Sequence, residues 1–324
     1  MAILVGIDEA GYGPHLGPLV VAAAAFDFAS DEPPDPDLWP SLEEHLSKQP
    51  SARDSRVVVC DSKLAYRNSR GLATLERAVL GFLAAGGHRP PDLAALLGLL
   101  TVPCAQADSN TASPWEKPEA HALPAASAPG DVDLAAGLFE KGLRTLDGRP
   151  GGLWANVASA ARLNRLMDGD RNKADALFAL TADLMAEVLR RYPAAAIHIT
   201  MDRHGGRRYY AELLSGALPM MPVETVEESP ALSRYRLLRP DGPPVTITVR
   251  DRCETWSLAT ALASMAAKYL RELHMIQFNA YFQARVPGLK PTAGYGLDAW
   301  RFLDDIAATT AADGLAGPAL LRAR

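Results

Sequence analysis

The sequence predicts an α/β protein with a mixed central sheet flanked by helices, and three observations favour this class. Short apolar runs typical of buried strands occur at residues 2–7 and 19–26. Residues 172–192 carry apolar side chains at spacings of three and four, which predicts an amphipathic helix. The Ala-rich stretch from about 255 to 282 is apolar on nearly all sides and predicts a buried helix. Strands mixed with long helices are typical of α/β and α+β domains.

The first two strands should pair as a hairpin. Residues 2–7 run directly into Asp8, and a turn rich in Gly and Pro occupies residues 11–18. The second apolar run, residues 19–26, is then expected to be the partner strand. The glycines of this turn would allow the backbone to approach a ligand closely.

Further elements follow from the same patterns. The apolar stripe of the helix at 172–192, which should end before Pro193, consists of Leu177, Leu180, Leu184 and Val188. The other expected elements are a strand at 57–60, a helix at about 70–86, a strand at 196–201, and an edge or half-buried strand at 245–249.

We expect residues 1–324 to form a single catalytic domain with two insertions. Residues 31–55 are rich in Pro, Asp and Ser, which suggests a surface insertion. A second insertion is expected at 88–150, where residues 88–130 show few periodic positions and predict an irregular segment. From about 255 to 324 the chain should form a helical part that packs beside the active site.

Composition bounds the function only loosely. The chain has 324 residues, 48% of them hydrophobic, which is ample for a sizeable core. The formal net charge of −5 is not typical of a nucleic-acid-binding protein. It does not exclude one, because affinity depends on where the Lys and Arg side chains lie.

The cysteines and the apolar segments indicate a cytoplasmic protein. The three cysteines, Cys60, Cys104 and Cys253, are odd in number and widely spaced, which makes a zinc site improbable and favours free thiols in a reducing compartment. No signal peptide or membrane span is evident, and no pattern calls for an organic cofactor.

Four acids carry the chemistry that the sequence suggests. Asp8 and Glu9 leave one apolar strand, Asp202 follows another, and Glu254 begins the Ala-rich helix. Each acid alone is explained by a turn or a helix start. If they converge at one sheet edge, they would repel one another unless cations lay between them. Oxygen ligands suit Mg²⁺ or Mn²⁺, and two such ions would hold a phosphodiester. Asp251 is an alternative to Glu254.

Five motifs, in order, resemble those of type 2 ribonucleases H, the ribonuclease HII family. The first and most specific is Asp-Glu-Ala-Gly-Tyr-Gly-Pro at residues 8–14, followed by Gly-Pro-Leu-Val-Val-Ala-Ala at 17–23. The others are Asp-Ser-Lys at 61–63, the strand before Asp202, Ala-Ser-Met-Ala-Ala-Lys at 263–268 with Arg-Glu at 271–272, and Gly-Tyr-Gly at 294–296.

This resemblance implies a ribonuclease H-like fold and a metal-dependent endonuclease. The substrate would be the RNA strand of an RNA–DNA hybrid, or ribonucleotides embedded in DNA. The family's metal-binding acids fall on the four acids already named. Its turn that reads the ribose 2′-hydroxyl falls on Gly11, Tyr12 and Gly13. Its tyrosine that senses the RNA–DNA junction falls on Tyr295.

Basic side chains near the motifs would form a local positive rim that binds phosphates despite the acidic total. The members assigned to substrate binding are Lys63, Arg207 and Lys268. His204 is more simply a polar loop residue than a proton carrier.

The chain departs from the family pattern where substrate choice is decided. Tyr12 stands where the family has arginine, Glu254 where it has aspartate, and the chain carries insertions. These departures leave three alternatives open: a nuclease of the same fold that cuts structured DNA, a non-catalytic nucleic-acid-binding module, and a structural protein. The oligomeric state, the preferred metal and the role of residues 88–150 are also open.

Overall fold

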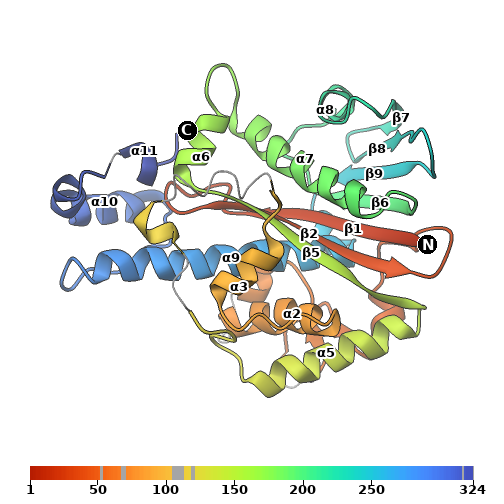
Figure 1. Cartoon of the computed structure of the whole chain (residues 1–324), viewed down its shortest axis with the longest axis horizontal. Coiled ribbons are helices and arrows are strands. Elements are labelled where there is room, and N and C mark those ends of the chain that lie inside the picture. The colour runs from red at the N-terminus through yellow and green to blue at the C-terminus, as the bar shows by residue number, and fades with distance from the viewer. Residues whose placement is uncertain (52–53, 67–70, 104–112, 118–120, 316, 324) are drawn as a thin grey trace.

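The computed structural model describes residues 1–51, 54–66, 71–103, 113–117, 121–315 and 317–323. Its centre is a seven-stranded sheet in the order β5-β2-β1-β6-β9-β8-β7 (Figure 1). The strands are β1 (Ala2–Ala10), β2 (Leu19–Phe28), β5 (Gly148–Ala158), β6 (Ala196–Met201), β7 (Val223–Glu228), β8 (Leu232–Leu237) and β9 (Val245–Arg250). The β1–β6 and β6–β9 pairs are parallel and the other pairs are antiparallel. The predicted class, a mixed sheet flanked by helices, is confirmed.

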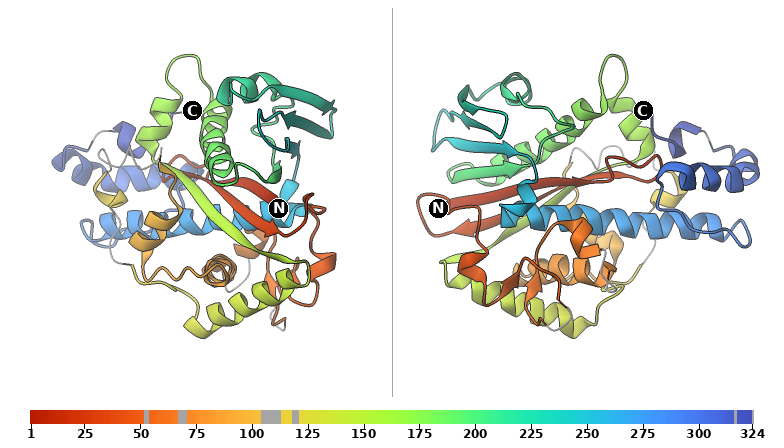
Figure 2. Two further views of the ribbon diagram at one scale, coloured as in Figure 1. Left: turned by 45° about the vertical axis from the view of Figure 1, so that its right-hand side comes forward. Right: turned by 180° about the vertical axis from the view of Figure 1, so that it is seen from behind.

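Helices cover both faces of this sheet, as Figure 2 shows from two sides. On one face lies α9 (Leu258–Gln283), backed by α2 (Gly71–Ala85) and α5 (Pro129–Arg144), and on the other lies α7 (Lys173–Arg191). β1 contributes side chains to the apolar cores on both faces of the sheet, because successive side chains alternate. Leu4 packs on the α9 side, whereas Ile3 and Val5 pack on the α7 side.

Shorter elements complete the described chain. They are η1 (Pro40–Leu42), β3 (Leu46–Ser47), β4 (Val57–Val58), α1 (Ser62–Tyr66), α3 (Leu93–Leu100), η3 (Pro114–Glu116), α6 (Ala160–Leu166), α8 (Ala211–Ala217), η4 (Cys253–Thr255), α10 (Gly296–Ala312) and α11 (Gly317–Leu320). A third apolar cluster joins the second half of α9 to α10 through Phe278 and Phe302, and Leu16 of the turn after β1 inserts into it.

The close crossing of α9 over β1 depends on Gly6. A Cβ atom at this position would lie 1.9 Å from the backbone nitrogen of Thr260. The start of α9 is also tied to β6, because the Thr200 hydroxyl lies 2.8 Å from the hydroxyls of both Ser257 and Thr260. The first turns of α9 are therefore held against the middle of the sheet, at the ends of β1 and β6.

Most of the predicted elements form. The expected hairpin is β1 and β2, the helix at 172–192 is α7, the helix at about 255–282 begins at Leu258 as α9, and the strand before Asp202 is β6. The strand expected at 245–249 forms as β9, but the edge alternative was wrong, because β9 lies between β6 and β8. Its three central side chains are buried, as an interior position requires.

The expectation of an irregular segment at 88–130 was wrong for residues 93–100. They form α3, capped where the Asp92 carboxylate accepts the Ala95 N–H at 2.8 Å. The helix buries Leu93, Leu96 and Leu100, at the helical spacing that the many surrounding Pro and Ala residues obscured.

Two cysteines are free and buried, Cys60 and Cys253, as predicted, whereas Cys104 lies outside the described residues. Within the described ranges, none of the helices has the length and apolarity that crossing a membrane requires.

Gly6→Ala should lower the free energy of unfolding by about 3 kcal/mol or more, because backbone atoms of α9 must move to admit a methyl group. The matched control is Gly137→Ala on α5, where an added Cβ meets nothing within 4 Å. That change should leave stability unaltered or raise it by up to about 1 kcal/mol. Urea denaturation measures both, and equal stability of the two variants would refute the close crossing.

Candidate active site

Two adjacent parallel strands deliver acids to the same level of the sheet. The register places Ile7 of β1 beside Met201 of β6. Asp8 follows the first and Asp202 follows the second, so the two carboxyl groups leave neighbouring strands side by side. The next strand, β9, is parallel to β6 and ends beside it before the chain enters η4, which carries Glu254.

A sharp reversal between β9 and α9 places the acid of η4. Arg252, before η4, adopts a left-handed conformation with φ of 53°, which is uncommon for a residue with a side chain. The backbone N–H groups of Arg252 and Cys253 then hydrogen-bond to the Asp202 carboxylate, which also accepts the Arg203 N–H at 2.9 Å. The reversal thus brings Glu254 to the end of β6 and also supplies donors to its carboxylate neighbour.

Successive side chains of an ideal strand point to opposite faces, but the carboxyl groups of Asp8 and Glu9 lie close enough to share a hydrogen bond. Asp8 lies beside the Ser264 hydroxyl of α9, which in turn donates to the Ser62 hydroxyl at 3.0 Å. Glu9 lies within the electrostatic reach of Asp202 and of Lys63. Both adjacent acids therefore lie within the electrostatic reach of Asp202.

The four acids form one electrostatic group, because the charge of Asp202 raises the pKa of each of the other three. Burial raises the pKa of Asp8 well above its ordinary value, and the Glu9 and Asp202 carboxylates add to the rise. Burial and Asp202 raise the pKa of Glu9 to about 7. Burial also raises the pKa of Asp202, and burial with Asp202 raises that of Glu254. Like charges confined in this way favour protonation or a bound cation.

Glu254 and Asp251 both lie near Asp202, and Asp251 also raises the pKa of Asp202, but the two side chains are placed differently. The Glu254 side chain is buried, and its Oε2 has no hydrogen-bond partner. The Asp251 side chain is 68% exposed and lies 3.5 Å from Arg203. A buried carboxylate oxygen without a donor is costly unless a ligand satisfies it. Asp61 also lies within the electrostatic reach of Glu254.

The donor set suits a hard divalent cation, although its side chains do not yet surround one. All four groups offer carboxylate oxygens, the ligands that Mg²⁺ and Mn²⁺ prefer, and the unpartnered Glu254 Oε2 is available to one. In the part of the chain that the structure describes, however, no three acidic, His or Cys side chains stand so that they could hold one ion. Binding would therefore require these carboxylates to rotate toward one another.

The turn after β1 brings together the residues expected to read the sugar. A Cβ atom on Gly13 would lie 3.9 Å from the Tyr295 ring, so the two predicted substrate-binding segments are neighbours. The Tyr12 hydroxyl lies 3.0 Å from the position of a Cβ on Gly205, in the loop that follows β6. Gly11, with φ of 90°, has no room for a side chain because Arg271 lies behind it.

The predicted basic residues are differently placed. Lys63 is exposed and lies near Glu9. Arg207 forms an ion pair with Asp175 at 2.5 Å, and Lys268 forms one with Glu272 at 2.6 Å. Arg207 and Lys268 would therefore have to leave or share these ion pairs in order to bind a phosphate.

His204 is buried, and burial lowers its pKa to about 3. Its backbone N–H donates to the Tyr210 hydroxyl at 2.8 Å, and its ring lies against those of Phe178 and Tyr210. These contacts agree with a structural role for the histidine and not with proton transfer.

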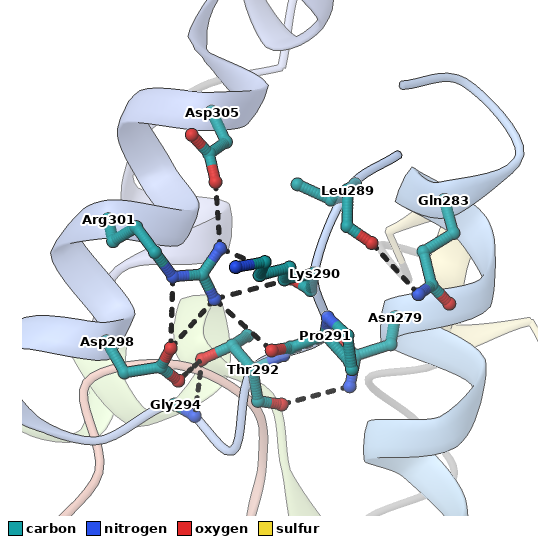
Figure 3. A network of polar contacts seen from close by, with 10 residues as sticks. All are labelled: Asn279, Gln283, Leu289, Lys290, Pro291, Thr292, Gly294, Asp298, Arg301 and Asp305. Atoms are coloured by element: carbon teal, nitrogen blue, oxygen red, sulfur yellow. Dashed lines mark hydrogen bonds and ion pairs between the residues drawn. The ribbon is translucent and has the colours of Figure 1, made fainter. Parts of the chain in front are cut away.

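A polar network orders the loop that carries Tyr295 (Figure 3). Arg301 donates to Asp298 and Asp305, at 2.7 and 2.8 Å, and to the carbonyls of Lys290 and Pro291. The side chain of Asp298 in turn accepts from the Thr292 hydroxyl at 2.5 Å. The loop is thereby fixed on α10.

Several residues near the site had no predicted role. Ser264 and Asp61 lie within motifs that were recognised, but no role followed from the motif alone. Asp175 and Arg322 carry no sequence signal that links them to the site. Their positions follow only from the three-dimensional fold.

Without divalent ions, stability should fall as the pH rises from about 5 to about 8. The pKa of Glu9, about 7 in the folded protein against an ordinary 4.5, means that folding retains a proton which is lost over this range. Glu9→Gln should therefore stabilise the metal-free protein at about pH 8, by on the order of 1 to 3 kcal/mol.

Urea denaturation in a chelator, at both ends of this pH range, measures the effect. The control is Glu44→Gln, because Glu44 is exposed and outside the group. If Glu9→Gln destabilised the protein equally at both pH values, repulsion among the acids would be the wrong explanation.

Comparison with known proteins gives structural neighbours only. No family model matches the chain, and no curated protein matches its sequence. Among solved structures, the chain is similar to ribonuclease HII of Archaeoglobus fulgidus, solved with PCNA, at 15% identity and a TM-score of 0.41, covering 99% of this chain and 94% of that one. It is similar to ribonuclease H2 of Pyrococcus horikoshii OT3 at 14% identity and a TM-score of 0.40, covering 98% and 92%.

A third neighbour is Bst-RNase HIII in complex with Mn²⁺, at 14% identity and a TM-score of 0.41, covering 99% of this chain and 66% of that one. These neighbours are of the kind that the sequence motifs resemble.

Proposed function

We propose that the protein is a metal-dependent endonuclease that hydrolyses the RNA strand of RNA–DNA hybrids, or the backbone at ribonucleotides embedded in DNA. The observation that carries the proposal is the gathering of four partly or fully buried carboxyl groups at the ends of β1, β6 and β9, where the charge of Asp202 raises the pKa of the other three. Functional sites commonly contain such clusters of carboxyl groups with raised pKa values.

Two divalent ions, Mg²⁺ or Mn²⁺, would be held by the carboxylates of Asp8, Glu9, Asp202 and Glu254. When bound, such ions neutralise charge on the phosphodiester and lower the pKa of a water molecule. In the proposed reaction, water attacks phosphorus and the bond to the 3′-oxygen breaks, leaving 5′-phosphate and 3′-hydroxyl ends. The protein contributes the carboxylates, the donors that orient Asp202, and the hydroxyl of Ser264 that orients Asp8.

The turn at Gly11, Tyr12 and Gly13 would read the 2′-hydroxyl that distinguishes RNA from DNA. It lies next to Tyr295, which is 47% exposed and so can pack against a neighbouring deoxyribose. Lys63, exposed near Glu9, would contact a phosphate. A nucleic-acid strand bound across the turn would thus contact the backbone of the turn, the Tyr295 ring and the Lys63 ammonium group.

Tyr12 favours a second candidate, a nuclease of the same fold that acts on structured DNA. The side chain provides no cation at the turn, and burial raises the pKa of its hydroxyl. A reader of the ribose 2′-hydroxyl should cut a duplex with one ribonucleotide much faster than the same duplex in DNA. Equal or faster cutting of branched all-DNA substrates would favour the second candidate.

The direct test is cleavage of a labelled duplex that contains one ribonucleotide, with Mg²⁺ or Mn²⁺ present. Asp202→Asn should lower the rate by a factor on the order of 10³, because the carboxylate that raises the pKa of the other three acids loses its charge. Glu254→Gln should also be strongly impaired, whereas the matched control Asp251→Asn should retain activity within about threefold.

Absence of cleavage by the parent protein would overturn the proposal, as would full activity of Asp202→Asn. Calorimetry separates the remaining alternative. A protein that bound the hybrid but took up no metal would be a non-catalytic binding module.

A further inference from the structure

We propose that Arg322 is a positioning residue for the substrate-reading turn at residues 11–17, a role that rests on the proposed function of that turn. Arg322 lies after α11, about 300 residues along the sequence from the turn it contacts. Its side chain is 2% exposed and forms no ion pair among the described residues. A buried arginine without a carboxylate is costly, so what it binds is informative.

Arg322 binds the turn almost entirely through backbone carbonyls. Its Nε donates to the Gly17 carbonyl at 2.7 Å, and its Nη2 donates to the same oxygen. Its Nη1 donates to the carbonyls of Gly11 and Pro14. Its backbone N–H donates to the His15 carbonyl at 3.0 Å. The planar fork of a guanidinium is well suited to several fixed acceptors, which an ammonium group is not.

Arg271 of α9 supports the turn from beside Arg322. It is 1% exposed, and its Nη2 donates to the carbonyls of Leu16 and Ala293 at 3.4 and 3.1 Å. Together the two arginines engage the carbonyls of Gly11, Pro14, His15, Leu16 and Gly17. The carbonyl side of the turn therefore faces the protein interior.

The loop before α10 holds the opposite side of the same peptide units. In a trans peptide, the C=O and the following N–H point in opposite directions. The Pro14 carbonyl accepts from Arg322, while the His15 N–H donates to the Gly294 carbonyl at 2.7 Å. The His15 carbonyl accepts from Arg322, while the Leu16 N–H donates to Gly294 at 3.3 Å. The turn is clamped between Arg322 and the loop that carries Tyr295.

The same geometry orients the N–H at the front of the turn. Because the Gly11 carbonyl points inward to Arg322, the Tyr12 N–H of that peptide points away from it, toward the side where substrate would lie. Gly11 has φ of 90°, so this orientation depends on a conformation that glycine alone adopts readily. Arg322 thereby fixes the direction of a donor that would read the sugar.

The segment that carries Arg322 is itself anchored to α6. The Asn164 side chain donates to the carbonyls of Pro318 and Leu321, at 3.1 and 2.9 Å. Its oxygen accepts the Ala323 N–H at 2.7 Å. Leu320 is buried in the cluster that contains Leu16. These contacts place the guanidinium at the turn without any contribution from substrate.

Amide hydrogen exchange tests the clamp directly and independently of activity. In Arg322→Ala, the amides of His15 and Leu16 should exchange at least about tenfold faster than in the parent, while β6 and α7 stay protected. Arg322→Lys, which keeps the charge but not the fork, should give an intermediate effect and remains informative if the alanine variant does not fold. The control Arg89→Ala, at a 61% exposed surface position, should change nothing.

Kinetics then test positioning for substrate. For a duplex with one ribonucleotide, Arg322→Lys should raise KM about tenfold with kcat within about threefold, and reduce the preference over all-DNA duplex by a similar factor. A merely structural role would lower the melting temperature without altering this preference.

The possible failures are distinguishable. A parent that cleaves no substrate rejects the proposed function, while hydrogen exchange still decides whether Arg322 orders the turn. A parent that cleaves, with Arg322 variants equal to it in exchange, KM and preference, overturns the inference and leaves the proposed function standing.

Discussion

The burial of carboxyl groups close to one another, at the ends of β1, β6 and β9, is the constraint around which this structure is arranged. β1 and β6 are parallel neighbours, and their register places Asp8 and Asp202 side by side. Glu9 and Glu254 approach the same point from the adjacent residue and from the reversal after β9. Burial, with the repulsion between neighbouring carboxylates added to it, raises their pKa values, and this cost is relieved when a proton or a cation is bound. A protein that retains such a cost at one place commonly uses it for binding.

Two supports hold the acids in place. The first is the crossing of α9 over Gly6, which brings Ser264 to Asp8 and fixes the reversal that carries Glu254. The second is the clamp on the turn at 11–17, in which Arg271 and Arg322 bind the carbonyls and Gly294 binds the amides. The acids and the turn are thus both supported by α9, and in the proposed function this holds the metal-binding and sugar-reading groups in a fixed relation.

Much of this was predictable from the sequence, for reasons that are local. Apolar runs ending in acids identified β1 and β6, and the helical spacing of leucines identified α7. Where local signals conflict, prediction failed. The start of β5, Gly-Arg-Pro-Gly-Gly, contains residues that disfavour strands, yet it pairs with β2 across a bulge at Ala25 and Phe26. Such a strand forms because its partner and the core below it outweigh its own preferences.

The candidate site divides in the same way. Its acids follow strands and were recognisable one at a time, but their proximity depends on strand order, which no local pattern specifies. The choice between Asp251 and Glu254 depends on which side chain is buried. The role of Arg322 could not be predicted from the sequence, because its partners are backbone carbonyls, which every residue possesses. Long-range contacts to backbone leave no mark in residue identity.

The most direct measurement is anomalous X-ray diffraction from crystals of the protein grown with Mn²⁺. Anomalous peaks enclosed by the carboxylate oxygens of Asp8, Glu9, Asp202 and Glu254, and absent in Asp202→Asn, are the expected result. Manganese bound elsewhere, with these four side chains directed into separate regions, would contradict the central claim that folding gathers them to hold cations.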